Sequence, residues 1–311
     1  MKNRVGVMFV GLCGHLSTTA MAGAMALAKN LSPGTGMISE LANFKNIPFM
    51  DMSDFIFGGW DIRPCYDSRQ ALKDIGFDNI DDLIKISKRL ETIQSQTFPG
   101  ILLNAGQAIS DISDQNHVFK TESLSKAVDK IKEDIENFKL ENSVEKIIVI
   151  NLASTEPPVA DTRQLSTIES ICRLIDENQV DNIRPSLVYA YAAITSGCAY
   201  INFTPSDAGF SQGLVDLATK HNVPVMGSDG KTGETLVKSA LAPMFAARNL
   251  EVLSWEGYNI LGNMDGKVLQ NKENGSTKIK SKDRLLPHIL GYNPHSRVTI
   301  DYVPSLGDRK T

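Results

Sequence analysis

The segment from Ser228 to Lys238 carries the side chains best suited to chemistry on an anionic substrate. Lys231 and Lys238 are seven residues apart, which is about two helical turns, so both ammonium groups lie on one face with Thr235 between them. The helix follows an expected strand at 223–226, and a helix N-terminus at a strand end favours anions. Two ammonium groups placed there suit a phosphate together with a developing oxyanion.

The same pattern also fits the solvated polar face of a surface helix. Glu234 lies three residues after Lys231 and four before Lys238, so its carboxylate could bridge the two lysines. Exposed pairs of this kind contribute only a few tenths of a kcal/mol. The strand-end setting favours the functional interpretation. The G-K-T within the segment does not make a P-loop, because the upstream glycine spacing is wrong.

A glycine-rich turn follows the first expected strand, at 5–10. Gly11 and Gly14 would let the backbone approach a pyrophosphate lying on the N-terminus of the next helix. The spacing is G-x-x-G-x-x-S rather than G-x-G-x-x-G, so a purely structural turn is the alternative. We expect the hydroxyl residues at 17–19 to cap the helix in either case. The residues predicted to contact a dinucleotide here are Gly11, Gly14, His15, Leu16, Ser17 and Thr18.

Two further segments should meet this turn at one edge of the sheet. N-L-A-S-T-E-P, at 151–157, follows the clearest strand, and ligands of open α/β sheets bind at such strand ends. An ordinary polar turn is the alternative. Asp61 follows a Gly58-Gly59 kink and could reach a ribose hydroxyl or be a solvated loop acid. The further dinucleotide contacts predicted from these segments are Asp61, Ala153, Ser154 and Thr155.

Strands and helices alternate over about the first 230 residues, which predicts a doubly wound parallel sheet. The expected strands are 5–10, 54–62, 146–152, 199–203 and 223–226. The expected helices are 17–30, 68–90, 123–140, 166–178, 186–196 and 213–221. We also expect an extended piece at 37–40 and a loop at 98–101.

The regular alternation of strands and helices ends after residue 226. A helix is expected at 231–248, an extended piece at 252–260, a polar stretch at 262–282 and a strand at 298–303. K-I-K-S-K, at 278–282, is expected on an exposed edge or loop. The predicted fold class is therefore α/β, with a Rossmann-like doubly wound domain at 1–226 and a second α+β domain, catalytic and oligomerising, at 227–311.

The composition is that of a soluble globular protein. The chain has 311 residues, of which 42% are hydrophobic and 22% charged, with a net charge of −4. Nothing in this balance suggests nucleic acid or an anionic membrane as a partner. The four cysteines are far apart, so we expect buried thiols in a reducing cytoplasm rather than zinc ligands or a disulfide framework. The histidines show no metal-binding spacing, and no stretch is apolar enough to span a bilayer.

Several segments together resemble the myo-inositol-1-phosphate synthase family, and most closely its shorter, prokaryotic-type members. The last four of these segments are highly specific in combination. The segments are G-L-C-G-H-L-S-T-T, F-G-G-W-D-I-R, N-L-A-S-T-E-P, Y-A-Y-A-A, Y-I-N-F-T-P-S, G-S-D-G-K-T-G-E-T-L-V-K, Y-N-I-L-G-N-M-D-G-K-V-L and D-Y-V-P-S-L-G-D-R-K.

The resemblance implies conversion of D-glucose 6-phosphate to 1L-myo-inositol 1-phosphate. NAD⁺ would oxidise C5, C6 would be deprotonated and joined to C1 by an aldol step, and the NADH formed would reduce the C5 ketone. An enolate and an alkoxide both need positive charge placed in advance. The implied catalytic residues are Lys238, Lys282, Lys231, Lys310, Asp265 and Asp308. Asp229 is implied at the nicotinamide end, and the implied substrate contacts are Asn202, Thr204, Ser206 and Asn263.

The sequence departs from the family pattern in two places. Cys13 and Ser17 replace glycines of the commoner glycine-rich loop, and the chain ends just after G-D-x-K, where members continue into a tail that adds active-site residues. The chain is therefore expected to be either a fragment or a natural truncation of a family member. The resemblance also implies a tetramer formed through the second domain, and it leaves a divalent or monovalent cation open. Two alternatives remain, namely a dehydrogenase of the homoserine or semialdehyde type and an inactive paralogue that binds NAD.

Overall fold

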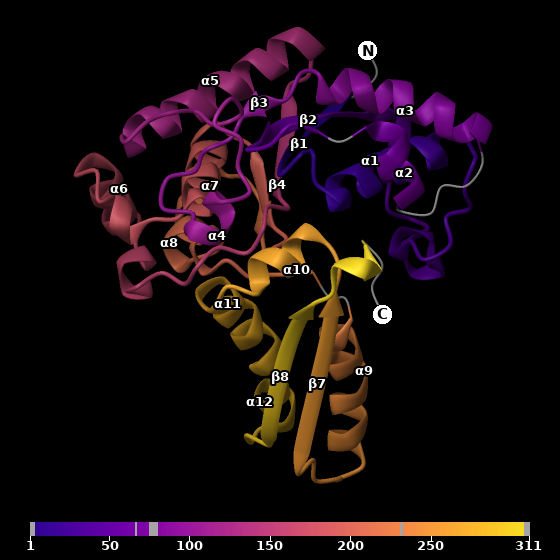
Figure 1. Cartoon of the computed structure of the whole chain (residues 1–311), viewed down its shortest axis with the longest axis vertical. Helices are drawn as coiled ribbons and strands as arrows, with labels where there is room; N and C mark the ends of the chain where they lie inside the picture. Colours follow the sequence, from indigo (N-terminus) through magenta and orange to yellow (C-terminus); the bar gives the residue numbers. More distant parts are fainter. Residues whose placement is uncertain (1–3, 66, 75–79, 231–232, 308–311) are drawn as a thin grey trace.

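The computed structural model describes residues 4–65, 67–74, 80–230 and 233–307. It has two lobes, which Figure 1 shows one above the other. The larger lobe contains a six-stranded parallel sheet with helices on both faces, and the smaller lobe contains a two-stranded parallel sheet with helices against it. The predicted fold class, a doubly wound parallel sheet followed by further α and β structure, is confirmed.

The large sheet has the strand order β3-β2-β1-β4-β5-β6. Its order reverses beside β1, so the carboxyl ends of β1 and β4 flank the point where ligands bind in sheets of this kind. The strands are β1 (Val5–Val10), β2 (Phe55–Asp61), β3 (Phe98–Pro99), β4 (Lys146–Asn151), β5 (Ala199–Asn202) and β6 (Val225–Met226).

Strand β1 shows why the sheet is buried on both faces. Val7 and Phe9 pack into one apolar cluster with α1 (His15–Ala28), α2 (Ser68–Asp74) and α3 (Ile80–Gln94). Met8 and Val10 point the other way, because side chains alternate along a strand, and join the cluster on the opposite face. The helices of that face are α5 (Leu124–Asn142), α6 (Ile168–Asp176), α7 (Pro185–Thr195) and α8 (Gln212–His221).

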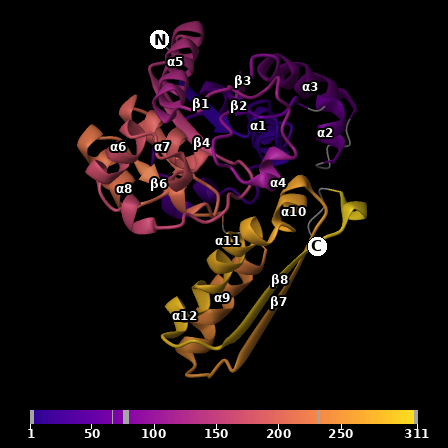
Figure 2. The ribbon, with the colours of Figure 1, turned by 60° about the vertical axis from the view of Figure 1, so that its left-hand side comes forward.

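The smaller lobe is built on β7 (Ser254–Leu261) and β8 (His295–Tyr302), which pair in parallel along their whole lengths. Parallel neighbours need a crossover, and α10 (Met264–Leu269), α11 (Lys272–Asp283) and α12 (Leu285–Leu290) supply it. Helix α9 (Glu234–Ala247) packs against α12. Figure 2 shows α10 and α11 at the junction between the lobes, and Asn274 of α11 donates a hydrogen bond to the Thr155 carbonyl (2.7 Å).

Three local predictions from the sequence were wrong. Residues 37–40 contain a 3₁₀ turn rather than an extended piece, and residues 98–99 form the edge strand β3 rather than a loop. K-I-K-S-K lies in helix α11, because Asn271 accepts a hydrogen bond from the Glu273 N–H and starts the helix upstream of it. The remaining short helices are α4 (Gln107–Ser110), η1 (Ile38–Glu40), η2 (Ala42–Phe44), η3 (Met52–Asp54), η4 (Thr162–Leu165), η5 (Val180–Asn182), η6 (Asp207–Gly209) and η7 (Pro304–Leu306). In the described part of the chain, no helix combines the length and apolarity needed to cross a bilayer.

The prediction of four free thiols was wrong for one pair. Cys13 and Cys65 form a disulfide with their Cα atoms 4.6 Å apart, whereas Cys172 and Cys198 are free. Strand β1 pairs in parallel with β2, so the turn after β1 lies beside the segment after β2. The sequence separation of 52 residues gives no sign of this neighbourhood, which arises from the sheet register.

Gly11 tests whether the turn after β1 needs a glycine. Its φ is +89°, and a Cβ there would lie 3.2 Å from Ala153 Cα. Gly11→Ala should therefore lower the free energy of unfolding by about 1–3 kcal/mol in urea titrations. Gly23→Ala in α1 is the control: its Cβ would meet nothing within 4 Å, and it should raise that free energy by about 0.5–1 kcal/mol. Equal stability of the two variants would contradict this account.

Candidate active site

The turn from β1 into α1 leaves the helix N-terminus without a side-chain cap. Gly14 is the N-cap residue, and no side chain accepts from the first-turn N–H groups. The predicted capping by residues 17–19 was therefore wrong: the Ser17 hydroxyl donates to the Gly11 carbonyl (2.7 Å), and the Thr19 hydroxyl donates to the His15 carbonyl (2.7 Å). The uncapped N–H groups are suited to a pyrophosphate.

A cavity lies at the carboxyl ends of β1, β2 and β4. Five of the eleven residues predicted to contact a dinucleotide line this cavity, and the close approach of Gly11 to Ala153 leaves no space for a side chain there. Glycine backbone without side chains, next to a helix N-terminus without a cap, fits a dinucleotide pyrophosphate. The lining of the cavity includes Gly11, Gly14, Asp61, Ala153, Ser154 and Glu156. Of the remaining predicted contacts, His15 and the exposed Leu16 begin α1, while Ser17 and Thr18 are buried within it.

Asp61 is buried at the end of β2 and is not a solvated loop acid. One carboxylate oxygen accepts from the Cys13 N–H (2.8 Å), and the other accepts from the Arg63 N–H (3.0 Å). Burial raises the pKa of Asp61, while the Arg63 charge and the N–H donors act in the opposite direction. Asp61 therefore fixes the glycine-rich turn as well as facing the cavity.

Glu156, which the sequence interpretation did not select, holds the loop after β4 in place. Its carboxylate accepts from both the N–H (2.8 Å) and the hydroxyl of Ser186 at the start of α7. Its own N–H donates to the Ser206 hydroxyl (3.1 Å). Burial raises the pKa of Glu156, and the Ser186 donors oppose the rise. Three loops at the carboxyl edge of the sheet are thus tied together.

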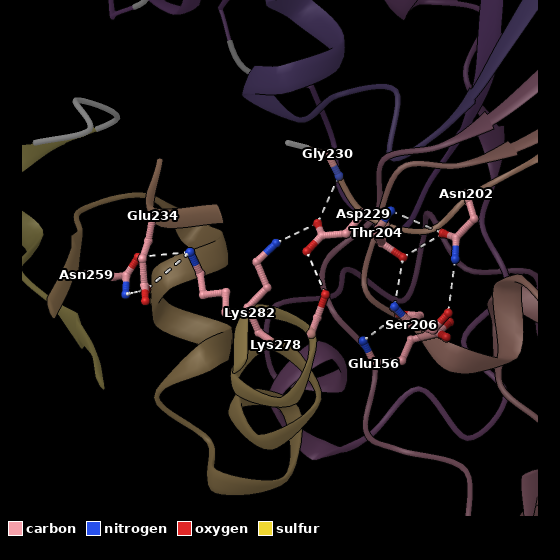
Figure 3. Close-up of polar contacts among 11 residues, drawn as sticks. Glu156, Asn202, Thr204, Ser206, Asp229, Gly230, Glu234, Asn259, Lys278 and Lys282 are labelled. Carbon is pink, nitrogen blue, oxygen red and sulfur yellow. Dashed lines mark hydrogen bonds and ion pairs between the residues drawn. The ribbon is translucent and has the colours of Figure 1, made fainter. Parts of the chain in front are cut away.

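The predicted substrate contacts after β5 form a buried network. The Asn202 side-chain oxygen accepts from the Thr204 hydroxyl (2.7 Å), and its amide donates to the Ser206 carbonyl (3.0 Å), as Figure 3 shows. Thr204 Oγ1 in turn accepts from the Ser206 N–H (3.2 Å). These bonds shape the loop beneath the site. A direct role of the three residues in substrate binding stays a prediction.

Asp229 connects the large lobe to α11. Its N–H donates to the Thr204 carbonyl (3.0 Å), and its carboxylate accepts from Lys278 Nζ (2.7 Å) and the Ser281 hydroxyl (3.2 Å). Figure 3 shows Lys278 directed at this carboxylate. The residue was predicted at the nicotinamide end of the site, and its position beside the loop after β5 is compatible with that role.

Lys238, Glu234, Lys282 and Asn259 form a cluster between α9, β7 and α11, in which both lysines are buried and the other two side chains are half-buried. Lys238 is wholly inaccessible to solvent, and its Nζ forms an ion pair with Glu234 Oε1 (2.8 Å) and donates to the Lys282 carbonyl (3.2 Å). Lys282 Nζ donates to Asn259 Oδ1 (2.9 Å) and lies 3.9 Å from Glu234 Oε2. The Asn259 amide donates to Glu234 Oε2 (2.7 Å). We call these four residues the lysine cluster.

The lysine cluster contradicts the interpretation of Lys238 as part of a solvated face. The Glu234–Lys238 pair has the i,i+4 spacing of a surface bridge, but both side chains are enclosed. With two ammonium groups and one carboxylate, the formal charge of the cluster is positive by one. Positive charge held away from water interacts strongly with an anion, because the low dielectric of the interior screens it poorly.

The structure brings together some of the predicted catalytic residues and not others. Lys238 and Lys282 meet in the lysine cluster, while Asp265 lies in the first turn of α10. Asn263 accepts from the Gly266 N–H (2.9 Å) and caps α10, so its substrate role stays a prediction. The three predicted residues outside the described part of the chain are Lys231, Asp308 and Lys310.

The sequence interpretation named Glu234 as a partner of Lys238 but missed Asn259 as a partner of Lys282 and Glu234. Asn259 lies in the quoted Y-N-I-L-G-N segment, but nothing in its spacing relates it to Glu234. Lys278 and Lys282 are four residues apart, so a helical reading of K-I-K-S-K would have placed both on one face. Within residues 4–65, 67–74, 80–230 and 233–307, no three His, Cys, Asp or Glu side chains gather as a metal site would require.

The sheet order, the uncapped turn after β1 and the enclosed lysines define an NAD-dependent enzyme with a Rossmann-type domain. The chain belongs to the myo-inositol-1-phosphate synthase family, whose model matches residues 5–290.

Named relatives agree with this membership. Inositol-3-phosphate synthase 1 of Bacteroides thetaiotaomicron is 30% identical over 99% of this chain and 75% of its own length. Inositol-3-phosphate synthase of Dictyostelium discoideum is 30% identical over 99% of this chain and 66% of its own. The crystal structure of inositol-3-phosphate synthase from Caenorhabditis elegans matches with a TM-score of 0.86 and 28% identity, over 99% of this chain and 66% of that one.

Asp61→Ala tests the predicted contact with the dinucleotide. The substitution removes the acceptor for two buried N–H groups at the turn, and it also removes any bond to a ribose hydroxyl. NAD binding measured by calorimetry should weaken roughly tenfold or more, since a bond to a charged group contributes about 1.5–3 kcal/mol. Asp129→Ala, on the exposed side of α5, should bind NAD as the unsubstituted chain does. An unchanged dissociation constant for Asp61→Ala would exclude Asp61 from the NAD site.

Proposed function

We propose that the chain converts D-glucose 6-phosphate to 1L-myo-inositol 1-phosphate, with NAD used and regenerated in each cycle. The observation that carries the proposal is the lysine cluster, in which both ammonium groups are buried. It occurs in a member of this family whose large lobe has a cavity of the NAD-binding type. Relatives named inositol-3-phosphate synthase support the reaction. The cytoplasmic location stays a prediction.

NAD, when bound, supplies the acceptor and donor of the hydride at C5 of the sugar. The chain's own residues have to hold the phosphate, stabilise the enolate formed when C6 loses a proton, and stabilise the alkoxide of the aldol step. Preorganised ammonium groups that are shielded from water perform such stabilisation at little reorganisation cost. Lys238 and Lys282 have these properties, because hydrogen bonds and an ion pair fix both before any substrate binds.

We assign the remaining roles by their position in the fold. Asp229 and Lys278 would close the site from the side of the large lobe, since their ion pair links the β6–α9 loop to α11. Asn202, Thr204 and Ser206 would form its floor at the end of β5. Lys231, Asp308 and Lys310 remain expected companions at the phosphate or oxyanion. Asp265 and Asn263, at the start of α10, would meet the sugar from the smaller lobe.

Lys238→Met tests the central role in this proposal. The substitution keeps a long apolar stem and removes the ammonium group, so turnover of glucose 6-phosphate to inositol phosphate should fall about 100- to 1000-fold, the effect of removing one oxyanion donor. NAD binding, which involves the other lobe, should be nearly unchanged. Product is measured by phosphate-resolved chromatography, with NADH absorbance followed in parallel.

The same assay separates the alternatives. Inositol phosphate without net NADH supports the synthase. Net NADH from a small acid such as homoserine would support a dehydrogenase instead. NAD binding without either product would support a binding protein. Normal turnover by Lys238→Met would remove Lys238 from the catalytic machinery.

We further propose that a second copy of this chain covers the outward face of α9. The usual distribution of side chains on a surface helix is reversed in α9: the face packed against the protein carries the ion-paired Lys238, and apolar side chains face outward. Parallel sheets are also rarely left open on one face, and Tyr258 of β7 and Leu253 just before β7 are exposed. The exposed apolar residues of α9 are Leu236, Val237, Leu241 and Met244.

Leu241→Asp should break this association. A carboxylate at the centre of an apolar interface would be buried without a partner, so the assembly should dissociate to monomers in sedimentation velocity. Lys220→Ala, on the exposed side of α8, changes the net charge by the same single unit and should sediment as the unsubstituted chain does. A monomeric unsubstituted chain would contradict the proposed association.

A further inference from the structure

Strand β7 provides Glu234 with space and a hydrogen-bond donor for its carboxylate. The side chain runs from the first residue of α9 to β7, where Gly257 leaves the space for it: a Cβ on Gly257 would overlap the Glu234 carboxylate. Asn259, two residues further along β7, donates its amide to Glu234 Oε2 (2.7 Å) and donates also to the Thr299 carbonyl (3.0 Å). The strand pair β7–β8 thus sets where this carboxylate lies.

The Glu234 carboxylate meets both ammonium groups of the lysine cluster. Lys238 pairs with one oxygen at 2.8 Å. Lys282 lies 3.9 Å from the other, as Figure 3 shows. The two other contacts of Lys238 Nζ in the described part of the chain are uncharged, namely the Lys282 carbonyl at 3.2 Å and the Trp255 ring, whose centroid is 6.0 Å away. Glu234 is therefore the counter-charge that lets Lys238 be enclosed as a cation.

We propose that Glu234 is a positioning residue that fixes the Lys238 and Lys282 ammonium groups at the reacting sugar. It holds the cluster at a single net positive charge, and it acts through the lysines rather than on the substrate. The inference rests on the proposed function, because it assigns to Glu234 the preorganisation that the enolate and alkoxide require.

The geometry distinguishes a carboxylate from an amide at this position. A glutamine could still accept from the Asn259 amide through its oxygen. Its NH₂ group would then face the Lys238 ammonium, so two donors would meet where an ion pair now lies. Glu234→Gln therefore removes the ion pair with Lys238 while it keeps the size of the side chain and its bond to β7.

Glu234→Gln should lower kcat about 100-fold, because a misplacement of about 1 Å in a catalytic group has an effect of that size. KM for glucose 6-phosphate and the dissociation constant for NAD should stay within about threefold, since the NAD crevice lies in the other lobe and the loss is expected in the transition state rather than in ground-state binding. Glu251→Gln, which neutralises an exposed carboxylate in the α9–β7 connection, is the matched control and should have unchanged kcat.

A second measurement does not depend on turnover. Acylation of lysine amines by a water-soluble N-hydroxysuccinimide ester, followed by peptide mass spectrometry, reports how firmly each ammonium group is held. Lys238 should be nearly unlabelled in the unsubstituted chain and in Glu251→Gln, and should label at least about tenfold faster in Glu234→Gln. If no inositol phosphate forms with any variant, the proposed function fails, whereas the labelling still tests the contact.

The results separate a positioning role from a purely structural one. Reduced kcat with faster labelling of Lys238, in a variant that stays folded at the assay temperature and keeps its NAD affinity, supports the proposal. A kcat within threefold of the unsubstituted chain, or unchanged labelling of Lys238, overturns it. If Glu234→Gln folds poorly, Glu234→Asp replaces it: this variant keeps the charge but is one methylene shorter, so kcat should again fall, and a fully active Glu234→Asp overturns the proposal.

Discussion

The burial of the Lys238 ammonium group is the constraint on which the smaller lobe depends. A cation without solvent contact needs a counter-charge and hydrogen-bond acceptors, and these come from Glu234 and from the Lys282 carbonyl. Helix α9 must therefore present its charged side to α11 and β7, and its apolar side is left outward. Gly257 follows from the same constraint, because β7 must approach the Glu234 carboxylate closely.

Helix α11 joins the two lobes at the proposed site. Asn274 near its start bonds to the Thr155 carbonyl in the loop after β4, Lys278 in its middle pairs with Asp229, and Lys282 near its end enters the lysine cluster. One helix thus passes from the edge of the dinucleotide cavity to the buried cations. A reaction that begins and ends with hydride transfer and has an enolate between needs such proximity, since every intermediate must stay in place.

The sequence predicted the large lobe well and the site in part. Val5–Val10 and Lys146–Asn151 were foreseen because buried parallel strands are continuous apolar runs, and Lys238 was selected because its spacing and strand-end setting are local features. The burial of Lys282 was not foreseen, because K-I-K-S-K read alone has the period of a strand. The Glu234–Lys238 pair has the same spacing on a surface or in an interior, and the Cys13–Cys65 bond depends on sheet register, so neither could be decided without tertiary structure.

The central claim is that a single enclosed site removes a hydride from the sugar, cyclises the product and returns the same hydride. Glucose 6-phosphate that carries deuterium at C5 tests it most directly, with the inositol phosphate formed in the presence of NAD⁺ examined by mass spectrometry. The account predicts that the product keeps the deuterium and that no deuterated NADH is released. Deuterium found in free NADH, or inositol phosphate that no longer carries the deuterium, would contradict it.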